Sequence, residues 1–95
     1  MEDDKFIRVF AVAQGRVQGV GFRYFVQTAA LNNSVTGWVK NMNDGTVEME
    51  LQGSEAKVHH LIGVIKKGNM YCRVDCFTMK ELEVNLHESG FHITH

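Results

Sequence analysis

Nine consecutive residues in the first quarter of the chain combine glycines, an amide and two arginines in a pattern suited to binding an anion. They are Gly15, Arg16, Val17, Gln18, Gly19, Val20, Gly21, Phe22 and Arg23. Because glycine has no side chain to obstruct approach, successive backbone N–H groups here can turn inward and form a concave cradle. The planar guanidinium of Arg23 can hold two oxygens of a phosphate group. The loop therefore predicts a phosphate site.

Two other kinds of phosphate-binding loop are excluded, because the sequence lacks residues that each of them needs. An ATP-binding loop needs a Lys and a Ser or Thr after its last glycine, and both are missing. A dinucleotide-binding loop needs a different glycine spacing and an acidic residue about 20 positions further on, and both are absent. A plain strand-to-helix turn with a solvated Arg23 stays open at this point, because glycine clusters are common in turns.

Apolar periodicity predicts the elements that must position the loop. The run from Phe6 to Ala13 is apolar except for Arg8, and it predicts a nearly fully buried strand just before the loop. From Phe22 onward apolar residues recur at helical spacing, and Asn32-Asn33-Ser34 predicts the end of that helix. The loop is therefore expected to join the end of a strand to the positive N-terminus of a helix.

The rest of the chain predicts a hairpin, a second helix and a further strand. Asn43-Asp44-Gly45 indicates a tight turn, and residues 46–52 after it alternate between apolar and polar side chains. Further expected elements are a strand from Val35 to Met42, a helix capped by Ser54 and ended by Gly68, a strand from Met70 to Leu82, and a short strand over Phe91 to His95. This order predicts a ferredoxin-like βαββαβ sandwich, an α+β fold with two helices on one face of a four-stranded antiparallel sheet. The terminal segment can add a short fifth strand.

Length, charge and composition define the class of protein. A chain of 95 residues is expected to form a single domain over 1–95. The net charge of −1 argues against a protein that coats nucleic acid. No stretch reaches the roughly 20 apolar residues of a membrane helix, and the polar start from Met1 to Lys5 lacks the features of a secretory signal. These points predict a cytoplasmic protein without membrane or nucleic-acid partners.

The cysteines and histidines do not indicate a disulfide or a metal site. Cys72 and Cys76 lie about 13 Å apart along the expected strand, which is too far for a disulfide. The pair His59-His60 lacks the i, i+4 spacing of a helical metal site, and His92 and His95 fall on opposite faces of a strand. We expect reduced thiols and neither a metal nor another cofactor.

Three blocks of this sequence together resemble the signature of the acylphosphatases. They are the loop 15–23, the string Gly37-Trp38-Val39-Lys40-Asn41, and the string Asp44-Gly45-Thr46-Val47-Glu48. The match covers about the first 55 residues closely, and it is specific because a long loop and a separate asparagine-bearing strand must agree at the right separation. The resemblance implies hydrolysis of an acyl phosphate to a carboxylate and inorganic phosphate, without a metal or cofactor.

The resemblance also implies roles for individual residues. Arg23 and the N–H groups from Gln18 to Arg23 would hold the phosphoryl oxygens, and Asn41 would position an in-line water. An amide side chain takes up no proton near neutral pH, so the proton would pass to a phosphate oxygen of the substrate. Inorganic phosphate is then the product and a competitive ligand of a monomeric enzyme. The family often ends in an aromatic residue, whereas this chain ends in His95.

Two rival functions fit the same fold. A noncatalytic acylphosphatase-like module would bind phosphate or an acyl phosphate through Arg23 and the loop but show no turnover. An RNA-binding domain would display aromatic residues on the open sheet face, and the candidates are Phe6, Phe10, Trp38 and Phe77. The charge balance argues against this second rival, and Trp38 is interpreted as packing within its strand.

Overall fold

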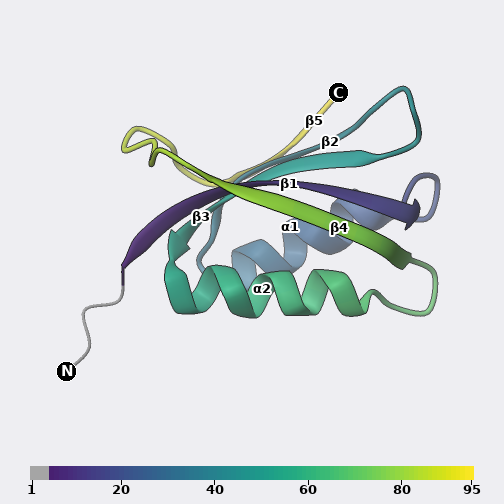
Figure 1. Ribbon diagram of the computed structural model, residues 1–95, viewed down its shortest axis with the longest axis horizontal. Coiled ribbons are helices and arrows are strands. Elements are labelled where there is room, and N and C mark those ends of the chain that lie inside the picture. The colour runs from purple at the N-terminus through teal and green to yellow at the C-terminus, as the bar shows by residue number, and fades with distance from the viewer. Residues whose placement is uncertain (1–4) are drawn as a thin grey trace.

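The computed structural model describes residues 5–95 and shows seven regular elements in that range (Figure 1). They are β1 (Phe6–Arg16), α1 (Phe22–Asn32), β2 (Thr36–Asn41), β3 (Val47–Ser54), α2 (Glu55–Lys67), β4 (Arg73–Leu82) and β5 (Phe91–Thr94). The prediction that the polar start from Met1 to Lys5 is no secretory signal concerns mainly residues 1–4, which lie outside the described part. No helix within the described range is both long and apolar enough to cross a membrane.

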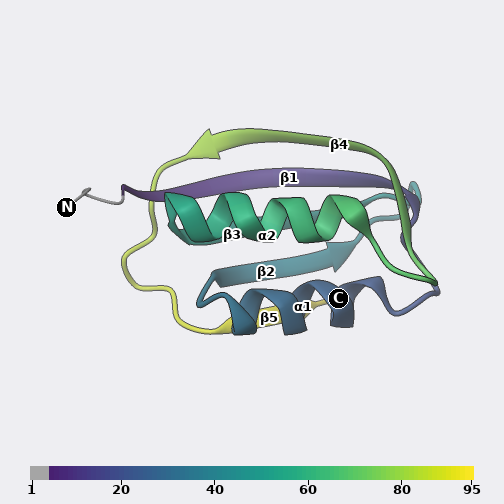
Figure 2. The ribbon, with the colours of Figure 1, turned by 90° about the horizontal axis from the view of Figure 1, so that it is seen from below.

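The sheet has the strand order β4-β1-β3-β2-β5, and both helices cover the same face of it (Figure 2). The first four strands pair in antiparallel fashion, which confirms the predicted ferredoxin-like α+β fold. The terminal strand β5 pairs in parallel with β2, so the complete sheet is mixed and not wholly antiparallel. The reason is topological, because residues 83–90 carry the chain from the β4 edge to the opposite edge of the sheet.

The core lies between this sheet and the two helices. The alternation predicted in the hairpin arm is confirmed, since Val47, Met49 and Leu51 are fully buried. The prediction of a nearly fully buried first strand is wrong at its start, where Phe6 is 53% exposed. The same strand continues beyond Ala13 to Arg16, because its end pairs with β4.

The start of β4 also differs from the sequence prediction. The strand begins at Arg73 instead of Met70. The Asn69 carboxamide accepts hydrogen bonds from the backbone N–H groups of Tyr71 and Cys72, both at 2.8 Å, and so holds these residues in a turn. Met70 is left 87% exposed at the tip of that turn. The predicted cap of α2 is confirmed, since Ser54 Oγ accepts a hydrogen bond from the Lys57 N–H.

Gly37 allows β2 to lie close to its neighbours in the sheet. Its φ of +144° is a conformation that residues with side chains rarely adopt, and a Cβ built there would collide with the carbonyl oxygen of Glu50. The nearest atom of Phe91 in β5 would lie 3.3 Å from that Cβ. A glycine here is therefore required both by the backbone angle and by the close approach of two other strands.

We expect Gly37→Ala to lower the free energy of unfolding by about 3 kcal/mol or more, because strain and steric overlap act together. The matched control is Gly63→Ala in the exposed face of α2, where a Cβ meets nothing within 4 Å. Removing a helix-interior glycine should raise stability by about 0.5–1 kcal/mol. Urea denaturation of both variants measures the difference, and equal stabilities would contradict the role given to Gly37.

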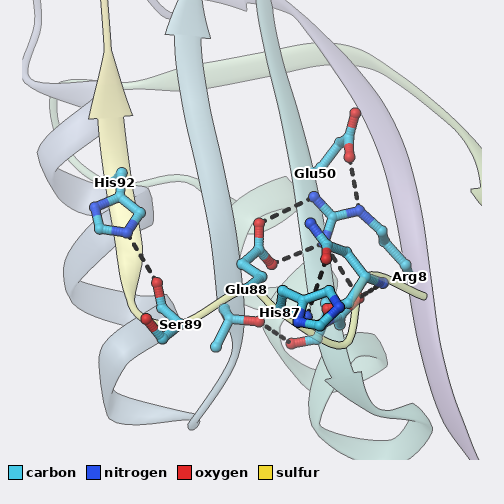
Figure 3. Close-up of polar contacts among 9 residues, drawn as sticks. Arg8, Glu50, His87, Glu88, Ser89 and His92 are labelled. Carbon is cyan, nitrogen blue, oxygen red and sulfur yellow. Dashed lines mark hydrogen bonds and ion pairs between the residues drawn. The ribbon is translucent and has the colours of Figure 1, made fainter.

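A cluster of charged side chains lies on the open face of the sheet (Figure 3). Arg8 Nε donates to Glu50 at 2.7 Å, while its two terminal nitrogens donate to the two carboxylate oxygens of Glu88 at 2.7 and 3.0 Å. Gln52 accepts a further hydrogen bond from Arg8 and donates to the Asn85 carbonyl. Arg8, which in the sequence only interrupts an apolar run, is therefore a buried anchor for residues 85–88.

The cluster shifts the protonation equilibria of its members. Hydrogen bonding to Glu88 is the main cause that raises the pKa of Arg8. Burial raises the pKa of Glu88, but hydrogen bonds from Arg8 and Thr36 and the charge of Arg8 outweigh burial and bring this pKa below its ordinary value of about 4.5. A carboxylate whose pKa is lowered by folding stabilises the folded state above the unfolded pKa, and that contribution is lost as the pH falls.

We therefore expect the free energy of unfolding to fall as the pH drops below about 4.5, in part because Glu88 becomes protonated. The Glu88→Gln variant should be less stable at neutral pH and should show a shallower decline in acid. Glu81→Gln is the control, because Glu81 lies 4.0 Å from Lys5 in an exposed pair. Denaturation series over this pH range measure both slopes, and parallel slopes for wild type and Glu88→Gln would contradict the assignment.

Candidate functional site

The predicted loop connects the end of β1 to the first turn of α1. Gly19 and Gly21 have φ angles of +73° and +77°, which glycine adopts without strain. Gly21 caps α1, and no side chain accepts a hydrogen bond at this cap. The first N–H groups of the helix therefore keep their capacity to bind an anion, and the helix dipole adds partial positive charge.

The two ends of the predicted loop have different roles. Gly15 and Arg16 belong to β1, where they pair with Val74 and Arg73 of β4. Gly15 is required there for packing, because a Cβ would collide with the carbonyl oxygen of Arg73. Arg16 is exposed and does not line the cavity described below. The loop residues that line the cavity therefore all lie within 17–23.

Gln18 fastens the loop to the neighbouring hairpin. Its amide nitrogen donates two hydrogen bonds of 2.8 Å, one to the carbonyl of Met42 and one to that of Thr46. Val17 is buried at the same place, and the thiol of Cys72 lies 3.6 Å from the carbonyl oxygen of Val20. The sequence predicts a role only for the backbone N–H of Gln18, because the partners of its side chain lie far along the chain and leave no local pattern.

A cavity of about 120 Å³ lies between the loop and β2. Its lining comprises Val17, Gly19, Gly21, Phe22, Arg23, Tyr24 and Asn41. This volume equals that of about four water molecules in the liquid, so it suits a small oxyanion with an adjacent water. The structure thus brings together Arg23 and Asn41, which are 18 positions apart in the sequence. Tyr24 was not predicted to be in the site, and Trp38 is absent from this lining.

The guanidinium of Arg23 is held from one side by the end of the chain. Its Nη1 donates to the carbonyl of Thr94 at 3.4 Å and lies 3.3 Å from His95 Nδ1. Because arginine has no acceptor, His95 Nδ1 must accept in this contact. Among residues 5–95 no carboxylate forms an ion pair with Arg23. Its positive charge is therefore unneutralised at the cavity.

The side chain of Asn41 carries an unusual polar atom. Within the described residues, Asn41 Oδ1 is the buried side-chain atom that has no hydrogen-bond partner. An unsatisfied buried acceptor costs about 1–3 kcal/mol, so such atoms commonly serve to bind a donor. Asn41 lines the same cavity as Arg23, so the residue that carries this unpaired acceptor lies beside the candidate anion site.

Larger hollows nearby lack this combination of groups. The one beside the cavity has a volume of about 520 Å³ and shares Asn41 with it. Its other lining residues are Lys40, Met42, Asn43, Asp44 and His95. Its lining includes no left-handed glycine and no helix N-terminus, so the smaller cavity is the better candidate for an anion site. In the described part of the chain, no three His, Cys, Asp or Glu side chains gather in a way that could hold a metal ion.

The fold and the cavity together define a small ferredoxin-like protein with a candidate oxyanion site at the start of its first helix. The acylphosphatase family model matches residues 9–93. The acylphosphatase of Geobacillus thermodenitrificans is 49% identical over 86 residues, which cover 90% of this chain and 92% of that protein. The chain therefore belongs to the acylphosphatase family.

Solved structures agree with this assignment. The crystal structure of acylphosphatase from Bacillus subtilis is 35% identical, has a TM-score of 0.89, and matches over 94% of this chain and 99% of the other. Full-length HypF in a phosphate- and nucleotide-bound form is 29% identical with a TM-score of 0.86. The match covers 99% of this chain but 12% of HypF, so this fold also occurs as a small part of a longer protein.

We expect Gln18→Ala to weaken the binding of inorganic phosphate about tenfold, because two hydrogen bonds that hold the loop are lost. The exposed Gln14 lies just before the loop, and Gln14→Ala is the control that should leave the affinity unchanged. Isothermal titration calorimetry with phosphate measures both dissociation constants. An unchanged constant for Gln18→Ala would mean that the loop keeps its shape without the hairpin.

Proposed function

We propose that this member of the acylphosphatase family hydrolyses the carboxyl–phosphate bond of acyl phosphates by metal-independent attack of a water molecule. The products are a carboxylate and inorganic phosphate. The observation that carries the proposal is the shared cavity, which is lined by the loop, by the unneutralised Arg23 and by Asn41, whose side-chain oxygen has no hydrogen-bond partner within the described residues. The acylphosphatase names of the relatives support the same reaction.

The cradle would bind the phosphoryl group of the substrate. Backbone N–H groups from Gln18 to Arg23 donate to its oxygens, and Arg23 adds a full positive charge from the side. Phosphoryl transfer depends mainly on positioning and on stabilising charge at these oxygens, so such a site can accelerate it without forming a covalent intermediate. Inorganic phosphate has the same tetrahedral oxygens and should compete with the substrate.

Asn41 would position the attacking water. A water that donates to Asn41 Oδ1 has its lone pairs free for the phosphorus atom. Holding this water in line with the scissile bond removes much of the entropic cost of the attack. The carboxamide cannot take up the proton, and the cavity lining contains no His, Asp or Glu. We infer that a phosphate oxygen of the substrate receives the proton while the carboxylate leaves.

Two substitutions separate binding from turnover. Arg23→Ala should abolish the binding of both acetyl phosphate and inorganic phosphate, because the charge is removed from the cavity. Asn41→Ala should lower kcat by a factor of about one hundred while phosphate affinity stays nearly the same. Steady-state hydrolysis of acetyl phosphate in the presence of a chelator, together with phosphate titrations, measures both effects.

The controls for this pair are also available in the chain. Arg23→Lys should bind poorly, since an ammonium cannot replace the two-pronged guanidinium. Asn43→Ala removes an exposed asparagine from the adjacent turn and should leave turnover unchanged. Full turnover in Asn41→Ala would refute the role of the carboxamide. A pH–rate profile that requires an enzyme base near neutrality would refute the substrate-assisted proton transfer.

The rival functions predict other outcomes. A noncatalytic module would bind phosphate with the same dependence on Arg23 but would not hydrolyse acetyl phosphate. An RNA-binding face is opposed by the two carboxylates, Glu50 and Glu88, that lie on the open side of the sheet. Phe77, one of the candidate aromatics, packs against the core. We further infer a cytoplasmic monomer, in keeping with the free thiols of Cys72 and Cys76.

A further inference from the structure

The ion pair between Arg8 and Glu88 joins the first strand to the segment that leads into the last one. The side chains are 6% and 11% exposed, and two parallel hydrogen bonds connect them (Figure 3). This two-pronged geometry fixes direction as well as distance. A buried ion pair is weak support for stability by itself, because desolvation offsets most of its attraction. The position of this one therefore calls for a reason other than stability.

Glu88 lies three residues before β5, which is a strand of four residues at the edge of the sheet. The Gly37 N–H donates to the carbonyl of Gly90 at 3.1 Å, and β5 then continues in parallel beside β2. A short edge strand has one neighbour to hold it, so its placement depends on what fixes the preceding segment. Here the preceding segment is fixed by Arg8.

Strand β5 contacts the helix that carries Arg23. Gln27 Nε2 donates to the carbonyl of Phe91 at 3.0 Å, one turn of α1 after Arg23. Arg23 itself donates to the carbonyl of Thr94, and the Thr94 hydroxyl donates to the carbonyl of Val39 in β2, both at 3.4 Å. The guanidinium at the cavity is thus held in place by a strand whose own position is set at its other end.

We propose that Arg8 and Glu88 are positioning residues for the hydrolysis, which fix β5 in register and thereby hold the Arg23 guanidinium at the cavity. The inference rests on the proposed function, since it assigns Arg23 to the phosphoryl group. Neither Arg8 nor Glu88 lines the cavity, and β5 is the element that connects the segment held by Glu88 with the contacts of Arg23.

The chain contains a matched control for this positioning role of Arg8 and Glu88. Arg8 donates to two carboxylates at the same distance of 2.7 Å, Glu88 in the segment before β5 and Glu50 in β3. The Glu50 side chain accepts its hydrogen bond from Arg8, and among residues 5–95 no hydrogen bond or ion pair is found between this side chain and β5. Removing either charge disturbs the same arginine, but only the loss of the Glu88 charge releases the strand beside Arg23.

The experiment compares Glu88→Gln with Glu50→Gln in the full chain. Acetyl phosphate hydrolysis gives KM and kcat, and calorimetry gives the dissociation constant of inorganic phosphate. For Glu88→Gln we expect KM and this dissociation constant to rise about tenfold, with a smaller change in kcat, because a displaced Arg23 weakens binding first. For Glu50→Gln we expect both to stay within about twofold of wild type.

A purely structural role gives a different result, because partial unfolding lowers the amount of active enzyme without changing KM. Unchanged KM and phosphate affinity in Glu88→Gln, or equal increases in both variants, would overturn the proposal. Thr94→Val keeps the shape of β5 while removing its hydroxyl contact with β2, and it should raise KM in the same direction. If Glu88→Gln does not fold, an unchanged KM in Thr94→Val overturns the proposal in its place.

The readouts also separate this inference from the proposed function. If the wild-type protein binds phosphate but does not hydrolyse acetyl phosphate, the proposed function is refuted. The phosphate affinities of the variants then still test the positioning role of Arg8 and Glu88. If the wild type hydrolyses acetyl phosphate, and Glu88→Gln changes neither KM nor the dissociation constant of phosphate, only the positioning role of Arg8 and Glu88 is refuted.

Discussion

Within the described part of the chain, several backbone N–H donors at the start of α1 have no side-chain acceptor, and they lie beside an arginine whose charge is not neutralised by a carboxylate. The first turn of α1 has no side-chain cap, and Arg23 has no carboxylate partner among residues 5–95. Leaving such groups unsatisfied costs stability in the free protein. In the proposed function this cost becomes selectivity for an oxyanion, because an anion of the right size would satisfy all of these donors together.

Three distant parts of the chain keep this arrangement in shape. Gln18 holds the loop against the β2–β3 hairpin, Asn41 enters from the end of β2, and Thr94 contacts Arg23 from β5. Each of these groups belongs to a regular strand or is bonded to one. The part of the site outside the helices and strands is therefore limited to residues 17–21, and the helix and sheet supply the rigid support.

The sequence predicted those features that depend on local residue types. Alternation in β3, the Ser54 cap and the glycine-rich connection are local, and the resemblance to acylphosphatases added Asn41. What it could not show depends on tertiary contacts. The parallel pairing of β5 follows from a crossover, and the burial of Arg8 follows from partners 42 and 80 positions away. The side-chain role of Gln18 is hidden for the same reason, since its acceptors are backbone carbonyls 24 and 28 positions away.

The contact between Arg23 and Thr94 spans 71 positions, so it has a consequence for synthesis on the ribosome. The loop and α1 are translated well before β5, the strand that holds the arginine. A nascent chain can therefore form the cradle without a fixed guanidinium. Long-range closure of this kind slows folding, because the entropy of a large loop must be lost first. If Arg23 binds the phosphoryl group as proposed, the complete site therefore forms only after β5 has been translated.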